Sequence, residues 1–178
     1  MKYLIISDIH GSSKYLKLVL EQVKDYDKII ILGDILYHGP RNKLPEGHNP
    51  MEIIEILNNL KDKIIAVRGN CEAKIDLELL KFEIKEKMWM IIDDKNIFLT
   101  HGDEYNKDSI PCKRRKYTIL HGHTHINQIV EVNNKVKVFN VGSLSLPQDN
   151  HHSYAIMEND VIKSYDLMTK EEIIKIEI

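Results

Sequence analysis

Cysteine, long apolar runs and an excess of one charge are all missing or scarce in this chain of 178 residues. Its two cysteines, Cys71 and Cys112, cannot form a disulfide framework. No apolar stretch approaches the roughly 20 residues that span a membrane. Only the segment from Tyr3 to Ile6 precedes the first polar cluster, which is too short for a signal peptide. We therefore expect a cytoplasmic protein with no membrane segment.

The charge balance also disfavours several classes of partner. The 25 basic and 27 acidic residues give a formal net charge of −2, so there is no general attraction to nucleic acid or to anionic membranes. The one basic run, residues 113–116, is expected to be a solvated loop rather than a phosphate-binding patch. A nuclease would need a more extended basic face. No Gly-rich lysine loop of the Walker type is present, which disfavours nucleotide kinase chemistry.

The first seventy residues alternate between apolar strand patterns and amphipathic helix patterns. A long loop over Gly33–Asn49 interrupts them, and a loop of this length in a compact domain is usually functional or part of an interface. The β-α-β-α-β order predicts parallel strands with right-handed crossovers. The predicted elements are a strand over 2–7, a helix from Ser12 or Ser13 to Lys24, a strand over Lys28–Leu32, a helix that starts at Pro50 and a strand over Ile64–Val67.

Beyond these elements the pattern predicts a short helix over Glu72–Lys81 and then mostly strands. No linker or repeat divides the chain, so we expect residues 1–178 to form one domain. The expected fold class is α/β, a sandwich of two mixed β-sheets flanked by helices. The later strands are predicted at Met88–Ile92, Asn96–Thr100, Tyr117–Leu120, Gln128–Val132, Val136–Asn140, Tyr154–Glu158, Val161–Tyr165 and Glu172–Glu177, with hairpin turns at Asn133-Asn134 and Asn159-Asp160.

Three histidines stand within five residues, in the segment His121-Gly122-His123-Thr124-His125. The segment follows an apolar run that is typical of a strand, so the imidazoles gather where that strand ends. Imidazole is a good ligand for Zn, Mn, Fe and Ni. A solvated His-rich loop would show the same residues, so this cluster does not establish a metal site by itself.

Four more polar clusters each follow an apolar run. They are Ser7-Asp8-Ile9-His10-Gly11, Gly33-Asp34, Arg68-Gly69-Asn70-Cys71-Glu72 and Thr100-His101-Gly102-Asp103. Five strand ends would thus deliver Asp, His and Asn side chains to one edge of a sheet. In open α/β sheets, that edge is where ligands bind.

Seven side chains form the candidate ligand set, which is more than one metal ion would need. If Asp34 bridges, two cations receive about four protein ligands each, and the neutral amide of Asn70 keeps the ligand charge low. Two cations about 3.5–4 Å apart lower the pKa of a water between them, and the hydroxide can attack phosphorus in line. The set is Asp8, His10, Asp34, Asn70, His101, His123 and His125.

These motifs, in this order and each behind a strand, resemble the calcineurin-like metallophosphoesterases over essentially the whole chain. Within this family, the chain is most similar to the small bacterial phosphodiesterases. The segments that carry this closer resemblance are His38–Asn42, Leu44–Gly47 and Asn140–Ser143. The resemblance implies an α/β sandwich, cleavage of small phosphodiesters (mostly artificial aryl esters) and a protein that self-associates.

The resemblance also implies a ligand assignment. Asp8, His10, Asp34 and His125 would hold one metal ion, and Asp34, Asn70, His101 and His123 would hold the other. Two divalent ions are expected, with Mn²⁺ first and Zn, Fe, Ni or Co as alternatives. His121 is expected to lie just outside the ligand set.

Two residues depart from the family pattern. Cys71 stands where many relatives carry a histidine that protonates the leaving oxygen, and a neutral thiol is a poor substitute. We therefore expect weak activity on monoesters and better activity on activated diesters. Asp103 stands where relatives commonly have His; it would either repel an anionic substrate or hydrogen-bond a ligating imidazole. Arg41 is a candidate phosphate clamp or a loop brace.

The candidate catalytic residues are therefore Asp34, Asn70, Cys71 and Arg41. We expect Cys71 to fill space near the site rather than to act as a nucleophile. The leading hypothesis is a metal-dependent phosphodiesterase. The alternative is a non-enzymatic interaction scaffold of the same fold, as some relatives are, although in such proteins the ligand positions tend to be lost and here all are filled.

Overall fold

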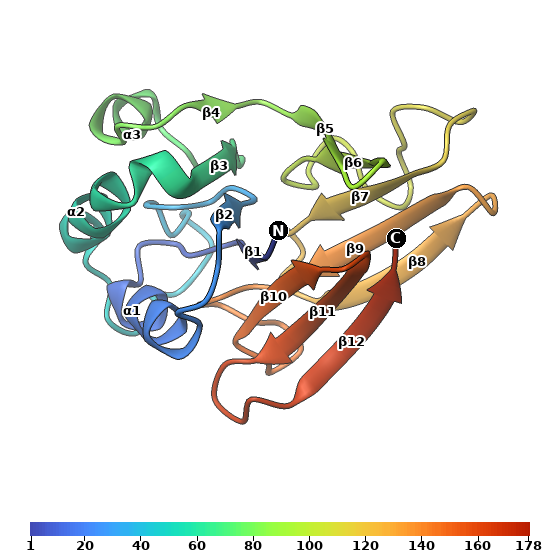
Figure 1. Cartoon of the computed structure of the whole chain (residues 1–178). Helices are drawn as coiled ribbons and strands as arrows, with labels where there is room; N and C mark the ends of the chain where they lie inside the picture. The colour runs from blue at the N-terminus through green and yellow to red at the C-terminus, as the bar shows by residue number, and fades with distance from the viewer.

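Two mixed β-sheets of seven and five strands form the framework of the protein in the computed structural model, which describes residues 1–178 (Figure 1). This arrangement confirms the predicted fold class. The larger sheet has the order β12 (Glu172–Glu177), β11 (Val161–Asp166), β10 (Ser153–Glu158), β1 (Tyr3–Ile6), β2 (Lys28–Ile31), β3 (Ile64–Val67) and β4 (Ile84–Lys85). The smaller has the order β5 (Met88–Ile92), β6 (Lys95–Leu99), β7 (Tyr117–His121), β9 (Val136–Val141) and β8 (Asn127–Val132).

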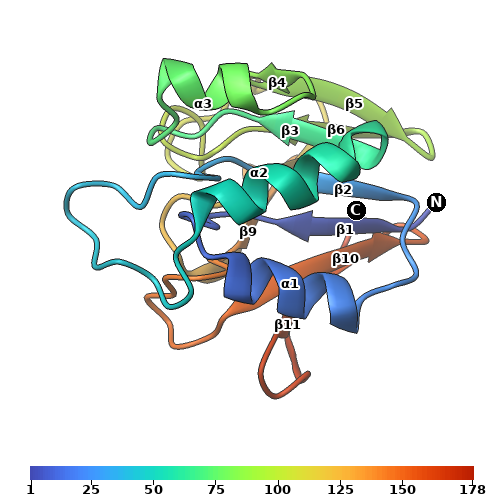
Figure 2. The same ribbon diagram turned by 90° about the vertical axis from the view of Figure 1, so that its left-hand side faces the viewer.

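The N-terminal half is built as the hydrophobic pattern predicts. Strands β1, β2 and β3 are parallel neighbours, and helices α1 (Ser13–Gln22) and α2 (Pro50–Asn59) connect them. The Ser12 hydroxyl caps α1 by accepting the Tyr15 N–H, and Asn49 caps α2 with Pro50 in its first turn. Figure 2 shows both helices on one face of the larger sheet.

The core has two main parts, one on each face of the larger sheet. Under the helices, buried residues such as Leu16 and Ile53 pack against alternate residues of β1 and β2. On the opposite face, Ile5 and Ile30 pack against Leu120 and Phe139 of the smaller sheet. Successive strand residues thus serve opposite cores, because side chains alternate between the two faces of a strand.

The structure differs from the prediction mainly between β3 and β5. Helix α3 spans only Lys74–Leu79, because the Glu72 side chain turns inward to bind backbone N–H groups and Ala73 precedes the first turn. Strand β4 has two residues and was not predicted, and Lys61–Lys63 form a short 3₁₀ turn. The predicted hairpin turns at 133–134 and 159–160 are confirmed.

The predicted long loop is the segment between β2 and α2. It contains no helix and no named strand, and Figure 2 shows it projecting from the body of the molecule. Its far end is anchored to α1 through the Ser12 hydroxyl, which donates to the Glu46 carbonyl at 2.5 Å. None of the helices combines the length and apolarity needed to cross a membrane.

Candidate metal centre

All seven candidate side chains lie together, where five strands end. Asp8 and His10 follow β1, Asp34 follows β2, Asn70 follows β3, His101 follows β6, and His123 and His125 follow β7. The parallel pairs β1–β2–β3 and β6–β7 run in register, which brings their carboxyl ends to one edge of each sheet. The two sheets pack face to face, so the two edges meet at this site.

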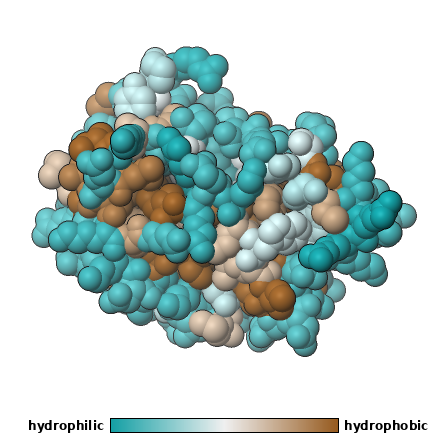
Figure 3. Space-filling model, turned by 90° about the horizontal axis from the view of Figure 1, so that it is seen from above, coloured by the Kyte–Doolittle hydropathy of each residue, from teal (hydrophilic) through white to brown (hydrophobic).

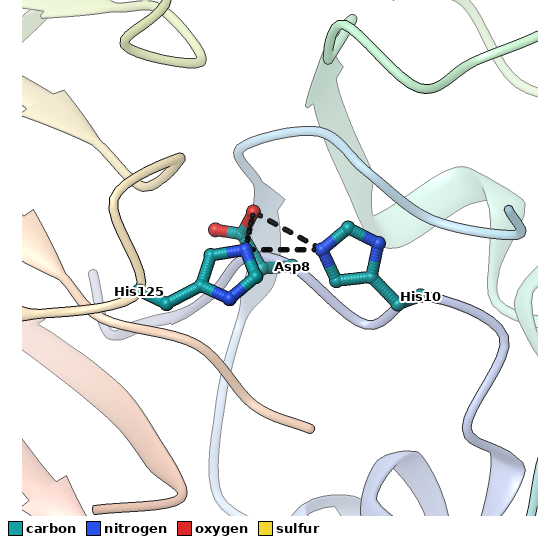
Figure 4. A group of neighbouring side chains, drawn as sticks. All are labelled: Asp8, His10 and His125. Carbon is teal, nitrogen blue, oxygen red and sulfur yellow. Dashed lines mark hydrogen bonds and ion pairs between the residues drawn. The ribbon is translucent and has the colours of Figure 1, made fainter. Parts of the chain in front are cut away.

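One group of potential metal-ligand atoms surrounds Asp8 (Figure 4). Asp8 Oδ1 lies 3.1 Å from His125 Nε2 and 3.6 Å from His10 Nε2, and the two Nε2 atoms are 3.1 Å apart. His10 Nε2 is also 3.7 Å from Asp34 Oδ2. A single ion could therefore contact the ligand atoms of Asp8, His10 and His125 at once.

A second group surrounds His101. Its Nε2 atom lies 3.5 Å from Asp34 Oδ2, 3.0 Å from Asn70 Oδ1 and 3.2 Å from His123 Nδ1. Asp34 Oδ2 is therefore near both groups. A carboxylate in this position can bind two cations at once, as the sequence predicts for Asp34.

Backbone carbonyls fix which nitrogen of each buried imidazole faces the centre. The Nδ1 atoms of His10, His101 and His125 lie 2.9, 2.7 and 2.6 Å from the carbonyl oxygens of Tyr37, Leu32 and Leu146. A carbonyl only accepts, so each Nδ1 carries the proton and donates it. In the neutral ring, the Nε2 lone pair then points into the site, as in proteins that bind metals through histidine.

The donor set fits divalent cations. With neutral imidazoles, the Nε2 lone pairs of His10 and His125 face each other and the carboxylate of Asp8, with no donor between them. Asp8 Oδ1 is buried and accepts no hydrogen bond from any of the described residues. Buried acceptors that face one another need a shared positive charge, either a proton or a metal ion.

The shifted pKa values of Asp8 and His101 also indicate that the centre stabilises a positive charge. Burial alone would raise the pKa of Asp8, but the imidazoles of His10 and His125 outweigh it and hold that pKa well below its usual range. Burial alone would lower the pKa of His101, but Asp34 and Asp8 outweigh it and raise that pKa to about 10. Without a cation, the centre therefore holds a proton on His101 near neutral pH.

The backbone at this edge is unusual, because five of the seven residues have a positive φ. The values are 53° for Asp8, 47° for His10, 53° for Asp34, 69° for His123 and 58° for His125. Few non-glycine residues adopt this left-handed conformation, although Asp and His are among those that tolerate it. Strands β1, β2 and β7 thus end in sharp turns that redirect these side chains into the site.

Gly69 allows the turn that carries Asn70 to approach Asp34. A Cβ atom at position 69 would overlap the Asp34 backbone nitrogen and side chain. The Cys71 N–H donates to Asp34 Oδ1 at 2.8 Å across the same contact. Only glycine leaves room for this approach, so the turns after β2 and β3 are locked together.

A cleft of about 370 Å³ opens onto the centre. Arg41 lines it from the long loop; the side chain is exposed and forms no ion pair in the structure. The Cys71 thiol also lines it, and burial, followed by the nearby Asp34 charge, raises the pKa of that thiol to about 12. Tyr37, Asn42 and Gln148 contribute further polar groups to the wall.

Two residues that the sequence left in doubt lie outside the donor groups. Asp103 is exposed, and its side chain makes no hydrogen bond to an imidazole. His121 is buried and donates its Nδ1–H to the Gly122 carbonyl at 3.0 Å, and burial lowers its pKa to about 4.

Sequence reasoning missed two residues that support the site. The buried carboxylate of Glu72 accepts the N–H groups of Ile35 and Gly69, one from each of the turns that carry Asp34 and Asn70. Asn140 donates to the Gly122 carbonyl at 2.9 Å and to Thr124 Oγ1 at 2.8 Å, which fixes the histidine loop. An acidic residue directly after the Gly-Asn-Cys turn was the one available hint for Glu72.

The chain is similar to known proteins in both sequence and structure. The family model of the calcineurin-like phosphoesterase superfamily domain matches residues 1–161. Phosphodiesterase YfcE of Escherichia coli (strain K12) is 40% identical over 166 residues, which cover 91% of this chain and 90% of that protein.

Two solved structures extend the comparison. The structure of YfcE, described as a phosphoesterase from E. coli, superposes with a TM-score of 0.94 and 37% identity, covering 100% of both chains. Vps29 from Entamoeba histolytica, solved with Zn²⁺, has a TM-score of 0.60 and 18% identity, and covers 99% of each chain. The second likeness concerns the fold alone.

Proposed function

Because the chain belongs to the calcineurin-like phosphoesterase superfamily and is a phosphoesterase, we propose that it hydrolyses phosphate diesters at a centre of two divalent cations. One observation carries the proposal: two groups of inward-facing carboxylate, imidazole and amide ligand atoms share the Asp34 carboxylate. We also propose that residues 1–178 act as one domain and that the protein self-associates.

In this proposal, each cation has four protein ligands. Asp8, His10, Asp34 and His125 would hold one, and Asp34, Asn70, His101 and His123 would hold the other. The mixed nitrogen and oxygen donors suit Mn²⁺, with Zn, Fe, Ni or Co as alternatives. When bound, such a pair of ions lowers the pKa of water and neutralises charge on phosphoryl oxygens.

The residues of the chain itself would orient the substrate. The Arg41 guanidinium is free of ion pairs and lies in the cleft wall, where it would bind a phosphoryl oxygen through charged hydrogen bonds. The His10, His101 and His125 rings are already held by carbonyls, so they would not have to reorient when substrate enters.

The cleft supports a preference for good leaving groups. Cys71 occupies the place where an acid would protonate the leaving oxygen, but its pKa of about 12 makes the thiol a very weak acid at pH 7. Aryl oxides leave with little help from a proton, whereas alkoxides need more. Activated aryl diesters should therefore be hydrolysed faster than ordinary monoesters.

The test is metal analysis of freshly purified protein together with hydrolysis assays. The protein should hydrolyse bis(p-nitrophenyl) phosphate when Mn²⁺ is added, lose that activity with a chelator and regain it with excess Mn²⁺. Hydrolysis of p-nitrophenyl phosphate should be slower under the same conditions. If no diester is hydrolysed with any of the five metals, the hydrolase proposal fails and the scaffold alternative is favoured.

A further inference from the structure

One aromatic side chain stands in the wall of the cleft that opens onto the metal centre. Tyr37 lines this cleft and is 41% exposed. Other exposed large apolar side chains, such as Ile75 of α3 and Ile91 of β5, line no part of it. Figure 3 looks onto the side where those two elements lie and shows hydrophobic residues among hydrophilic ones. A substrate in the cleft would therefore meet one large apolar surface, the ring of Tyr37.

The Tyr37 ring is held in place before any ligand binds. Its backbone carbonyl accepts the Nδ1–H of His10 at 2.9 Å. The ring packs edge-on against His38, with centroids 4.9 Å apart, and the His38 ring packs edge-on against His48, at 5.5 Å. The His48 ring in turn lies so close to Gly11 that a Cβ atom there would overlap it. A ring braced in this way loses little conformational freedom when a ligand covers it.

The two ends of the cleft differ in what they offer a bound diester. Tyr37 is tied through its carbonyl to the ligand group around Asp8. Cys71 directly follows a residue of the group around His101, and its sulfur lies beside Gly39 of the long loop. Because Cys71 occupies the place of an acid for the leaving oxygen, the leaving group would point to that end. The ester group that stays on phosphorus would then point toward Tyr37.

A free amide lies at the same end as Tyr37. Gln148 also lines the cleft, and its backbone N–H donates to the His125 carbonyl at 2.9 Å. Since His10 and His125 have their Nε2 atoms 3.1 Å apart, the residues bound to these two histidines flank the same part of the site. The side-chain amide of Gln148 makes no hydrogen bond within the protein. Its donor and acceptor are therefore free to bind heteroatoms of a ligand.

We propose that Tyr37 determines specificity by stacking on an aromatic ring in the ester group that stays on phosphorus. This role rests on the proposed function and defines the class of diester, because the retained group would be a nucleoside or an aryl-substituted alcohol. Both carry the flat π surface that stacks on a phenol ring. Stacking on an aromatic side chain strengthens binding by about 5- to 150-fold.

Two diesters with the same leaving group would isolate this contribution. They are methyl p-nitrophenyl phosphate and benzyl p-nitrophenyl phosphate. In both, water replaces p-nitrophenolate at phosphorus, one proton is released, and methyl or benzyl phosphate remains. The ratio of kcat/KM for the benzyl ester to that for the methyl ester therefore cancels metal binding and leaving-group chemistry. With Mn²⁺, wild type should give a ratio of about ten or more.

Variants of Tyr37 would assign this ratio to the ring. Tyr37→Ala should lower it about tenfold, mainly through a higher KM for the benzyl ester, whereas Tyr37→Phe should keep it, because a phenyl ring also stacks. Leu44→Ala is the matched control: it truncates a 63% exposed side chain of the same loop that does not line the cleft, and it should keep the wild-type ratio. Titration calorimetry with benzyl phosphate and methyl phosphate would make the same comparison without turnover.

Several results would overturn the stacking role. Equal use of the two esters by wild type, or an unchanged ratio in Tyr37→Ala, would do so. A ratio that Tyr37→Phe loses as fully as Tyr37→Ala would show that the ring is not the cause. Hydrolysis of neither ester by wild type with any of the metals would instead refute the proposed function, and the role of Tyr37 with it.

Thymidine 5′-(p-nitrophenyl) phosphate would identify the source of the ring. If the retained group is a nucleoside, kcat/KM for this ester should exceed that for the benzyl ester, because the Gln148 amide would bind the base. Gln148→Ala should then remove the excess. If the ring is a simple aryl group, the benzyl ester should be the better substrate. Either result supports stacking when Tyr37→Ala lowers kcat/KM for the better ester about tenfold, and an undiminished value refutes it.

Discussion

Asp34→Asn is the most informative substitution, because it removes one charge and almost no volume. Asp34 is buried, and its Oδ1 atom accepts the Cys71 N–H at 2.8 Å, while Oδ2 lies 3.5 Å from His101 Nε2. Asparagine can keep the bond to Cys71 through its own Oδ1. Its NH₂ group would then replace Oδ2 and point two donors toward the centre, where the proposed function requires acceptors.

The expected magnitude follows from Coulomb's law. A unit charge about 4 Å from a cation contributes about 4 kcal/mol at an effective dielectric constant near 20. Because about 1.4 kcal/mol corresponds to a factor of ten, each cation should bind about 10³-fold more weakly. Asp34 is near both donor groups, so the affinity should fall at both sites and turnover should drop by at least the same factor.

Titration calorimetry with Mn²⁺ and hydrolysis of bis(p-nitrophenyl) phosphate would measure the two effects. Asp103→Asn is the matched control: it makes the same change at an exposed acid two residues from His101, and it should leave metal affinity within about threefold, because exposed charges are screened. If Asp34→Asn binds Mn²⁺ about as well as wild type, or if the control loses as much affinity, the shared-carboxylate proposal is refuted.

Three further outcomes are expected. Mn²⁺ affinity should rise between pH 6 and pH 9. Asp34 and Asp8 raise the pKa of His101 to about 10 against the effect of burial, so an entering cation must displace a proton. In the metal-free protein this proton contributes stability that is complete below about pH 6.5 and is lost as the pH rises through about 10, so thermal melts without metal should show a decline. An affinity that does not change with pH would contradict this. Cys71→Ser should keep most activity on aryl diesters, since loss of a general acid costs about 10²–10⁴-fold and a thiol with a pKa of about 12 is not an effective one; a loss of that size would identify a catalytic thiol. Glu72→Gln should lower the free energy of unfolding by about 1–3 kcal/mol, since one amide oxygen cannot accept both the Ile35 and Gly69 N–H groups. Denaturant unfolding would measure this change, and an unchanged free energy of unfolding would contradict the role given to Glu72.

The location of the site could be predicted from the sequence because it follows from strand order. Asp8 and Asp34 each follow an apolar run, and parallel strands joined by right-handed crossovers bring such ends to one edge. His101 and His123 follow the parallel pair β6–β7 in the same way. Periodicity and motif order therefore sufficed to bring together seven side chains that span more than a hundred residues of the chain.

The supporting contacts could not be predicted, because they depend on tertiary structure. The Leu146 side chain is apolar and gives no sign of a role, yet the Leu146 carbonyl, 21 residues along the chain, fixes the His125 tautomer. Glu72 matched a helical pattern, and nothing in that pattern indicates that its carboxylate turns inward to bind Ile35 and Gly69. Local propensity ranks a buried acid as improbable, so only the packed structure could identify this role.

The left-handed turns explain why so much support surrounds a few ligands. Non-glycine residues such as Asp8 and Asp34 adopt a positive φ at a cost of order 1–3 kcal/mol each, and such conformations persist only where their surroundings enforce them. Here the enforcing contacts are particular ones: the Asp8 carbonyl accepts the hydroxyls of Ser143 and Ser145, and Asp34 is tied to the Cys71 N–H. Both anchors belong to the protein itself, so they hold these two turns while a proton on His101 supplies the positive charge that the facing acceptors need. Metal ions would therefore enter a site whose ligands are already oriented, and the strain stored at the strand ends is better understood as the cost of that orientation than as a by-product of folding.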